Sequence, residues 1–365
     1  MKLLFVNLSS LKFTVQTPDQ SPLGGSESAL CYLARALAAR GHQISLIANL
    51  PETQNFLIET VAHYPVATLK DLAFFAAEKF DAIIICNAPA AAAPLKAAAP
   101  SSRILFWAHA LPDQPAMQSL ALAQTKQAID AALCVSSWQQ SEIERAFGPF
   151  RHSAVIGNGI APAFENMFAS PDDLFRSKQN RAAYTTTPYR GLAVLLRAMQ
   201  GYGGAAQLDI FSSMRVYQAD DTDYTLLFAE AAQNPAITLH GSVTQSELAR
   251  HLRATAFLFY PCIYPETFCI TAAEAMAAGL KIVSTALGAL SETTAGYASL
   301  VPLTSSDGDV LVKDFRAAMQ TAEREFAADP LAWAQQAFAQ SQYANRVFTW
   351  KQRASEWEEQ LRALL

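Results

Sequence analysis

The sequence is poor in charge and lacks the features that mark several common protein classes. Only 16% of its 365 residues are charged and the net charge is −5, so nothing indicates the basic surface that nucleic-acid binding requires. No apolar run reaches the length of a membrane-spanning helix. The five cysteines are scattered and odd in number, without the paired spacing of a zinc site. This usage predicts reduced thiols in a cytoplasmic protein.

The sequence also lacks clear motifs for a signal peptide, for dinucleotide binding and for metal binding. The N-terminal run MKLLFVNLSSLKF lacks a small-residue cleavage site, which favours a first strand over a signal peptide. Gly24 and Gly25 are not followed by the next glycine of the dinucleotide fingerprint, which argues against a nicotinamide-dependent oxidoreductase. The acidic pairs at 221–223 and 307–309 lie in polar stretches rather than at the ends of apolar strands. We expect turn and helix-cap residues there, and no metal site.

Hydrophobic residues make up 51% of the chain, enough for sizeable cores, and the length suggests two domains. Short apolar runs alternate with helical patterns throughout, which predicts an α/β protein with two doubly wound parallel sheets. The turn Gly157-Asn158-Gly159 separates the halves, giving domains 1–158 and 159–347. Residues 161–180 have the composition of an exposed inter-domain connection, and 116–131 is predicted as one helix. The helix that follows the two glycines has Ser26 as its expected N-cap.

The most informative stretch runs from Tyr264 to Gly279 and reads YPETFCITAAEAMAAG. It follows a predicted strand that ends at Cys262, and an alanine-rich helix stopped by Gly279 completes it. The start of a helix after a strand is an anion site, because its first amides are unpaired and its dipole end is positive. Glu266 would repel a phosphate placed directly on it, so we expect it to face a sugar beside the phosphate. Glu274, on the helix flank, can reach a second hydroxyl cluster.

This pattern resembles glycosyltransferase family 4, whose members are retaining enzymes of the GT-B fold. The resemblance implies two Rossmann-like domains facing across a cleft, and a last helix, 348–365, that returns to the first domain. It implies that Glu266 contacts the donor sugar and that Glu274 holds the ribose hydroxyls of the nucleotide. The alternative is an ordinary helix with one capping and one solvated glutamate.

Other positions match the family in part. Gly24 and Gly25 match its glycine loop, which faces the donor diphosphate, although a plain helix-entry turn has the same sequence. His109 ends a predicted strand, where the family has a histidine close to the donor sugar. Of the two cations that the family places on the diphosphate, Arg190 occupies the lysine position and Thr185 replaces the arginine. The helix amides from Phe268 to Thr271 are expected to share that charge.

The resemblance therefore implies a complete set of site residues. The catalytic residues are His109, Arg190 and Glu266. The donor-binding residues are Gly24, Gly25, Arg190, Val243, Thr267, Phe268, Cys269, Ile270, Thr271 and Glu274. Val243 belongs to a segment, ITLHGSV, whose backbone lines the nucleotide base in the family.

The expected function is retaining, metal-independent transfer of a sugar from a nucleotide-diphosphate sugar, UDP- or GDP-linked, without a cofactor. The acceptor is a saccharide, lipid-linked or protein molecule that the sequence does not identify, and cell-envelope or exopolysaccharide assembly is the expected setting. We expect a cytoplasmic protein, with peripheral contact at the inner face of the membrane left open. Because both halves supply site residues, donor binding should compact the protein. The alternative function is a non-catalytic nucleotide-sugar binding protein or subunit, which the missing arginine at Thr185 favours.

Overall fold

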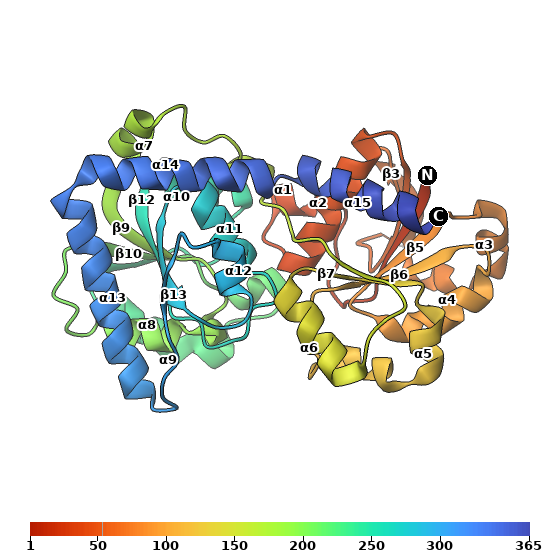
Figure 1. The fold of residues 1–365 in the computed structure, drawn as a ribbon, viewed down its shortest axis with the longest axis horizontal. Coiled ribbons are helices and arrows are strands. Elements are labelled where there is room, and N and C mark those ends of the chain that lie inside the picture. Colours follow the sequence, from red (N-terminus) through yellow and green to blue (C-terminus); the bar gives the residue numbers. More distant parts are fainter. Residues whose placement is uncertain (53) are drawn as a thin grey trace. The chain divides into compact units, whose positions relative to one another are not determined.

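A computed structural model describes residues 1–52 and 54–365. Contacts divide the chain into two compact units, and we describe each by itself. The first unit comprises Met1–Gly159 together with Trp350–Leu365, and the second comprises Ile160–Thr349. Each unit is built on its own sheet with helices on its faces (Figure 1).

The first unit has a sheet in the order β3-β4-β2-β1-β5-β6-β7-β8. All neighbouring strands are parallel except β3 and β4, which form an antiparallel pair at one edge. The apolar runs predicted as strands are buried along most of their length, as expected for parallel strands covered on both faces. The strands are β1 (Lys2–Asn7), β2 (Gln43–Ala48), β3 (Phe56–Ile58), β4 (Val61–Pro65), β5 (Ala82–Cys86), β6 (Arg103–Ala108), β7 (Ala131–Cys134) and β8 (Ser153–Val155).

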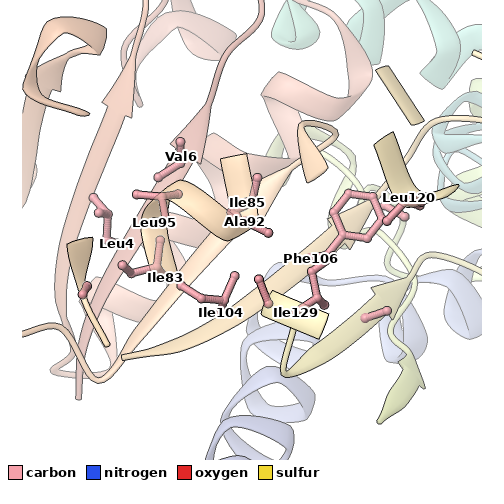
Figure 2. Close-up of a cluster of buried hydrophobic side chains, with 14 of the residues drawn as sticks. Leu4, Val6, Ile83, Ile85, Ala92, Leu95, Ile104, Phe106, Leu120 and Ile129 are labelled. Carbon is pink, nitrogen blue, oxygen red and sulfur yellow. The ribbon is translucent and has the colours of Figure 1, made fainter. Parts of the chain in front are cut away.

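One face of this sheet packs on short helices. Figure 2 shows Leu4 and Val6 of β1, Ile83 and Ile85 of β5 and Ala92 of α4 among the side chains of a continuous apolar cluster. The helices of the unit are α1 (Thr17–Gln20), α2 (Gly25–Ala39), α3 (Leu72–Glu78), α4 (Ala92–Ala98), α5 (Ala123–Ala128), α6 (Ser137–Phe147) and α15 (Trp350–Leu364), with 3-10 turns η1 (Val66–Lys70), η2 (Pro89–Ala91) and η3 (Pro115–Ala121).

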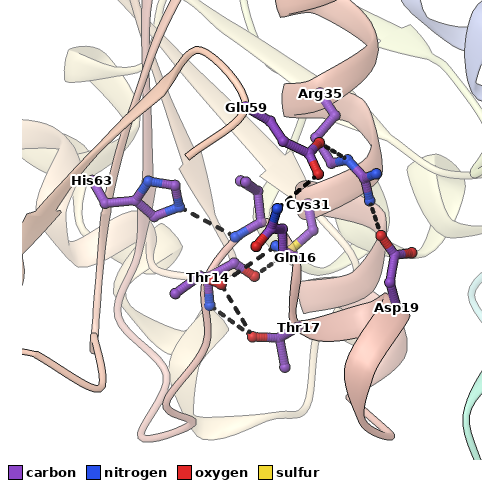
Figure 3. Close-up of polar contacts among 9 residues, drawn as sticks. Thr14, Gln16, Thr17, Asp19, Cys31, Arg35, Glu59 and His63 are labelled. Carbon is purple, nitrogen blue, oxygen red and sulfur yellow. Dashed lines mark hydrogen bonds and ion pairs between the residues drawn. The ribbon is translucent and has the colours of Figure 1, made fainter. Parts of the chain in front are cut away.

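Polar contacts hold the loop from β1 to α2, which contains the short helix α1. His63 of β4 accepts a hydrogen bond from the amide of Val15 through Nε2, at 3.2 Å. Arg35 of α2 bridges Asp19 at 2.7 Å and Glu59 at 2.6 Å (Figure 3). These contacts fix the approach of the chain to the glycines that precede α2.

The second unit has six parallel strands in the order β11-β10-β9-β12-β13-β14. In chain order this is 3-2-1-4-5-6, the Rossmann arrangement, in which ligands bind where the order reverses, here between β9 and β12. The strands are β9 (Gln179–Tyr184), β10 (Gln207–Ile210), β11 (Ile237–Leu239), β12 (Thr255–Tyr260), β13 (Lys281–Thr285) and β14 (Ser299–Val301). The helices are α7 (Pro171–Ser177), α8 (Leu192–Met199), α9 (Thr225–Ala232), α10 (Gln245–Ala254), α11 (Ile270–Ala277), α12 (Leu290–Thr294), α13 (Gly308–Ala328) and α14 (Pro330–Val347), with 3-10 turns η4 (Pro162–Phe164), η5 (Pro188–Arg190), η6 (Met214–Tyr217) and η7 (Thr222–Tyr224).

Two sequence predictions about this scaffold are wrong. The single helix predicted for 116–131 is interrupted at Leu122, whose extended backbone separates η3 from α5. The buried residues of η3, Met117 and Leu120, are three apart, which suits a 3-10 turn. Residues 161–180 are a packed part of the second unit rather than an exposed connection, with Phe164 and Leu174 fully buried. Their polar residues form caps and ion pairs within the unit, including the partly exposed pair of Asp173 with Arg253 at 2.8 Å.

Two further findings concern the cysteines and the apolar content of the helices. All five cysteines are buried and free. Among the described residues, no helix is both long and apolar enough to cross a membrane.

Candidate functional site

Several residues predicted for the donor site, among them Glu266, Thr267 and Phe268, lie at the carboxyl edge of the second sheet. Thr185 follows β9, the segment 261–269 follows β12, and Gly288 follows β13. These ends border the point where the strand order reverses, which is where doubly wound sheets bind ligands.

Glu266 is buried, with 8% of its surface exposed. Its Oε1 accepts hydrogen bonds from Nη1 of Arg190 and from the hydroxyl of Tyr260, both at 2.6 Å. Its backbone forms a bridge with Gly288. A Cβ on Gly288, which has a φ of +64°, would lie 2.4 Å from the carbonyl oxygen of Glu266, so only glycine permits this approach. The position of Glu266 is therefore fixed by both its side chain and its backbone.

Arg190 ends the short turn η5 and enters α8. Its guanidinium lies over the ring of Tyr264, 4.5 Å from the centroid, and 5.4 Å from that of Tyr189. Burial lowers the pKa of Arg190, but the Glu266 carboxylate and the neighbouring Tyr217, Tyr260 and Tyr189 together outweigh burial and keep that pKa raised. The sequence predicts Arg190 as a phosphate ligand, and it predicts neither the tyrosines nor the ion pair to Glu266.

The start of α11 is held in an unusual backbone conformation. Its N-cap, Cys269, is left-handed with a φ of +76°, a geometry that costs about 1–3 kcal/mol in a non-glycine residue. The turn before it is tied by the hydroxyl of Thr293, which donates to the carbonyl of Phe268. Thr271 donates to the carbonyl of Thr185 at 3.3 Å. The amides from 268 to 271 therefore lie at a fixed helix start, where an anion is favoured.

Glu274 lies on α11 and is 5% exposed. Its Oε1 accepts a hydrogen bond from the amide of Ala161 at 3.2 Å. Burial raises the pKa of the Glu274 carboxyl to about 8, and the Ala161 amide acts in the opposite direction. This carboxyl is therefore mostly protonated at pH 7.

Side chains cap the C-terminal end of α11. Lys178 donates to the carbonyl of Ala278 at 2.6 Å, and Ser341 donates to the carbonyl of Ala277 at 2.6 Å. Gln340 donates to the carbonyl of Leu280 at 2.8 Å. These bonds satisfy carbonyls that a helix end otherwise leaves unpaired, and so they anchor the helix that positions Glu274.

Val243 lies between β11, which ends at Leu239, and α10, which begins at Gln245. Next to it, an aromatic pair joins the carboxyl ends of two strands. The rings of Phe211 and His240 stack with centroids 4.4 Å apart and an interplanar angle of 11°. His240 also contacts Asp209 at 2.8 Å. No sequence pattern predicts this pair, because it joins the ends of two different strands.

In the first unit, Gly24 is the N-cap of α2 and Gly25 is its first residue. Ser26 is therefore not the N-cap, and its hydroxyl instead donates to Glu27 at 2.9 Å. Glu27 is 5% exposed and also accepts from Asn7 at 3.5 Å. Its carboxylate already lies at the positive end of α2, so an anion placed there would meet a negative charge. No pattern in the sequence indicates this carboxylate.

His109 follows β6 and is half-buried. Its amide donates to Oδ1 of Asn87 at 2.7 Å, and its Nε2 lies 3.1 Å from Oδ1 of Asn158. Its ring packs on Trp107, with centroids 4.5 Å apart. Burial lowers the pKa of His109 to about 4, so the imidazole is neutral at pH 7. A neutral imidazole can donate or accept a hydrogen bond at a reacting centre.

The two acidic strings serve as turn and cap residues, as the sequence predicts. Asp221 accepts from the amide of Met214 at 2.6 Å, and Asp307 accepts from the amide of Asp309 at 2.9 Å. Within residues 1–52 and 54–365, no group of three or more His, Cys, Asp or Glu side chains is arranged to hold a metal ion.

Two glycosyltransferase family models match separate parts of the chain. The model of Glycosyltransferase Family 4 matches residues 23–164, and the model of Glycosyl transferases group 1 matches residues 183–321. No curated protein matches the sequence.

Solved structures share the whole fold at low identity. Sucrose-phosphate synthase from Thermosynechococcus elongatus has a TM-score of 0.75 and 16% identity, over 100% of this chain and 98% of that one. HepE from Anabaena, in complex with UDP and glucose, has a TM-score of 0.71 and 16% identity over 100% of both chains. WaaG, a glycosyltransferase involved in lipopolysaccharide biosynthesis, has a TM-score of 0.66 and 13% identity over 99% of both.

Proposed function

Since this chain belongs to the family 4 glycosyltransferases and has the GT-B fold, we propose that it transfers a sugar from a nucleotide-diphosphate sugar to an acceptor with retention of configuration. The observation that carries this proposal is the arrangement around Glu266. A buried carboxylate lies at the carboxyl edge of the sheet, paired with Arg190 and followed directly by the start of α11. This arrangement supports the proposal, because a carboxylate can accept hydrogen bonds from sugar hydroxyls, and a neighbouring cation and helix amides suit a diphosphate.

The donor diphosphate is proposed to bind Arg190 and the amides at 268–271, while Glu266 accepts hydrogen bonds from the sugar. In the described structure Arg190 pairs with Glu266, so donor binding would add a second anion to the same guanidinium. The planar fork of arginine can bind two oxygens at once, which lets Arg190 keep Glu266 in place while contacting phosphate. Glu274 is proposed to hold the ribose hydroxyls.

The proposed reaction is a front-face displacement. The bond between the anomeric carbon and the leaving phosphate oxygen breaks, and the acceptor hydroxyl oxygen bonds to the same face of that carbon. The leaving phosphate oxygen takes the acceptor's proton, so no protein nucleophile is required. Arg190 and the α11 amides stabilise the departing charge. His109 of the first unit is proposed to contact the donor sugar as a neutral imidazole.

We further propose that the reaction needs no metal, and that the donor is UDP- or GDP-linked. UDP-glucose is the first probe to try, because HepE has been crystallised with it. Gly24, Gly25 and Val243 are retained as proposed donor contacts. Cell-envelope or exopolysaccharide assembly in the cytoplasm, with contact at the inner face of the membrane left open, is the proposed setting.

A panel of UDP-, GDP- and ADP-sugars tests the proposal. Thermal shift identifies the donor, since a ligand that binds only the folded state raises the melting temperature. Hydrolysis of that donor, or its transfer to offered acceptors, should then be detectable and should fall in Glu266→Gln, with Glu165→Gln as a control in the same unit. The second candidate, a non-catalytic binding subunit, is favoured by Thr185 in place of a cation. Tight donor binding without hydrolysis or transfer across the acceptor panel would support it and overturn the enzyme proposal.

A further inference from the structure

Asn158 contacts two functional elements of the first unit. It lies after β8 and is 3% exposed. Its side-chain oxygen is 3.1 Å from Nε2 of His109, and its backbone carbonyl accepts a hydrogen bond from Nε of Arg353, also at 3.1 Å. Arg353 is 6% exposed and belongs to the C-terminal helix α15. A buried amide is thus held on one side by the end of the chain while it contacts a proposed catalytic side chain on the other.

The contact fixes where the proton of His109 lies. An amide oxygen can only accept hydrogen bonds, so Nε2 of a neutral imidazole must carry the proton. Nδ1 is then the unprotonated nitrogen. The hydrogen-bond partner of one ring nitrogen therefore decides whether the other nitrogen carries a proton or a free lone pair.

Helix α15 holds Asn158 by packing as well as by hydrogen bonding. A Cβ on the adjacent Gly159 would lie 2.7 Å from the ring of Trp350, the first residue of α15, so this close approach requires glycine. Further along the helix, Trp357 packs on Trp107 with centroids 5.0 Å apart. Trp107 is the ring that lies against His109. One helix therefore supports both the hydrogen-bond partner and the packing partner of this histidine.

We propose that Asn158 is the positioning residue of His109, setting its tautomer and ring orientation, and that α15 maintains Asn158 through Arg353. The importance of this arrangement for sugar transfer rests on the proposed function. The arrangement itself can be tested without any substrate.

Nitrogen-15 NMR of the histidine side chains tests the tautomer directly. His63 is an internal control, because the amide of Val15 donates to its Nε2 and its Nδ1 contacts the carbonyl of Val61. His63 should therefore show the Nδ1–H tautomer and His109 the Nε2–H tautomer. Asn158→Leu should convert the His109 signals to a tautomer mixture, while His63 stays unchanged and reports an intact fold. Asn158→Asp keeps an oxygen acceptor and should preserve the Nε2–H form. An unaltered Nε2–H signal in Asn158→Leu, with His63 intact, would overturn the proposal.

The helix contribution is tested on α15. Arg353→Met should broaden or shift the His109 signals in the same direction as Asn158→Leu. Arg362→Met, on an exposed position of the same helix, should leave them unchanged. If the two variants behave alike, α15 does not maintain Asn158 and that part of the proposal fails.

Measurements of turnover distinguish a failure of this inference from a failure of the proposed function. If His109 acts on the donor, Asn158→Leu should lower kcat for donor hydrolysis or transfer by about tenfold or more, with a smaller change in KM, since orientation rather than binding is lost. A tautomer change with wild-type turnover in both Asn158→Leu and His109→Ala would support the positioning role of Asn158. That result would remove His109 from the proposed mechanism.

Discussion

The protonation of Glu274 should make donor binding depend on pH. Burial raises the pKa of its carboxyl to about 8, yet the ionised form is the one that can accept hydrogen bonds from two ribose hydroxyls. At pH 7 about one molecule in ten is ionised, so the apparent affinity is about tenfold below that of the ionised protein. Donor binding near neutral pH should therefore release a proton, and affinity should rise with pH until it levels off above 8.

Calorimetry can measure both effects. UDP-glucose, or whichever nucleotide sugar the screen identifies, is preferred to UDP because a terminal phosphate itself titrates near pH 6. Affinity should increase by about tenfold per pH unit below 8, and the heat should vary with the ionisation enthalpy of the buffer.

Two variants of Glu274 test whether its carboxyl group causes these effects. Glu274→Gln should abolish the pH dependence, and Glu274→Ala should weaken binding by about 1.5–3 kcal/mol through the lost ribose contact. Glu165→Gln is the matched control, because burial also raises the pKa of Glu165 in the same unit. Equal affinity at all pH values in the wild type, without proton release, would refute the reasoning.

Four other perturbations test the same structure. Gly288→Ala should lower activity strongly while the protein stays folded by circular dichroism, because the new Cβ would collide with the backbone of Glu266; wild-type turnover would contradict this. Arg190→Lys should reduce kcat on the order of 10²-fold, since lysine lacks the planar fork; steady-state assays with the identified donor would measure it. Lys178→Met should lower the free energy of unfolding by about 1–3 kcal/mol, because three buried carbonyls lose their donor; denaturant titration would reveal an unchanged midpoint if that view is mistaken. EDTA should leave activity intact, whereas loss that manganese or magnesium restores would overturn the metal-free proposal.

Much of the fold follows from short-range patterns in the sequence. Runs such as DAIIICN and RILFWAH are apolar over a whole strand, which indicates a parallel strand buried on both faces. The alternation of such runs with helices then selects doubly wound sheets. The predictions fail where contacts between distant segments determine the structure. Residues 161–180 are polar enough to suggest a linker, but Phe164 and Leu174 bury themselves while the polar side chains find partners within the unit. The sequence-based predictions include neither the helices α13 and α14 nor the strands β3 and β4.

In the candidate site, too, local features could be predicted and long-range contacts could not. Glu266 and Glu274 stand out because their spacing relative to a strand and a helix is local, whereas Arg190 stands out only through the resemblance to the family. Their partners do not stand out, because the contacts join distant segments. Ala161 meets Glu274 across 113 residues, and Arg190 meets Glu266 across 76. No periodicity within one element encodes such pairs, so the raised pKa of Glu274 could not be anticipated.

The replacement of a second cation by Thr185 is better understood from these contacts. Thr185 supplies a backbone carbonyl to Thr271 and so helps to fix the start of α11. Arg190, in turn, is held between Tyr264 and Glu266. A guanidinium restrained in this way loses less side-chain freedom when a phosphate binds, and a fixed helix start presents its amides without reorganisation. With one cation fewer, preorganisation of the remaining donors is the means by which this site could still stabilise a departing diphosphate. The tyrosines and the helix anchors at Lys178 and Gln340 are therefore as relevant to the chemistry as the residues that would contact the donor.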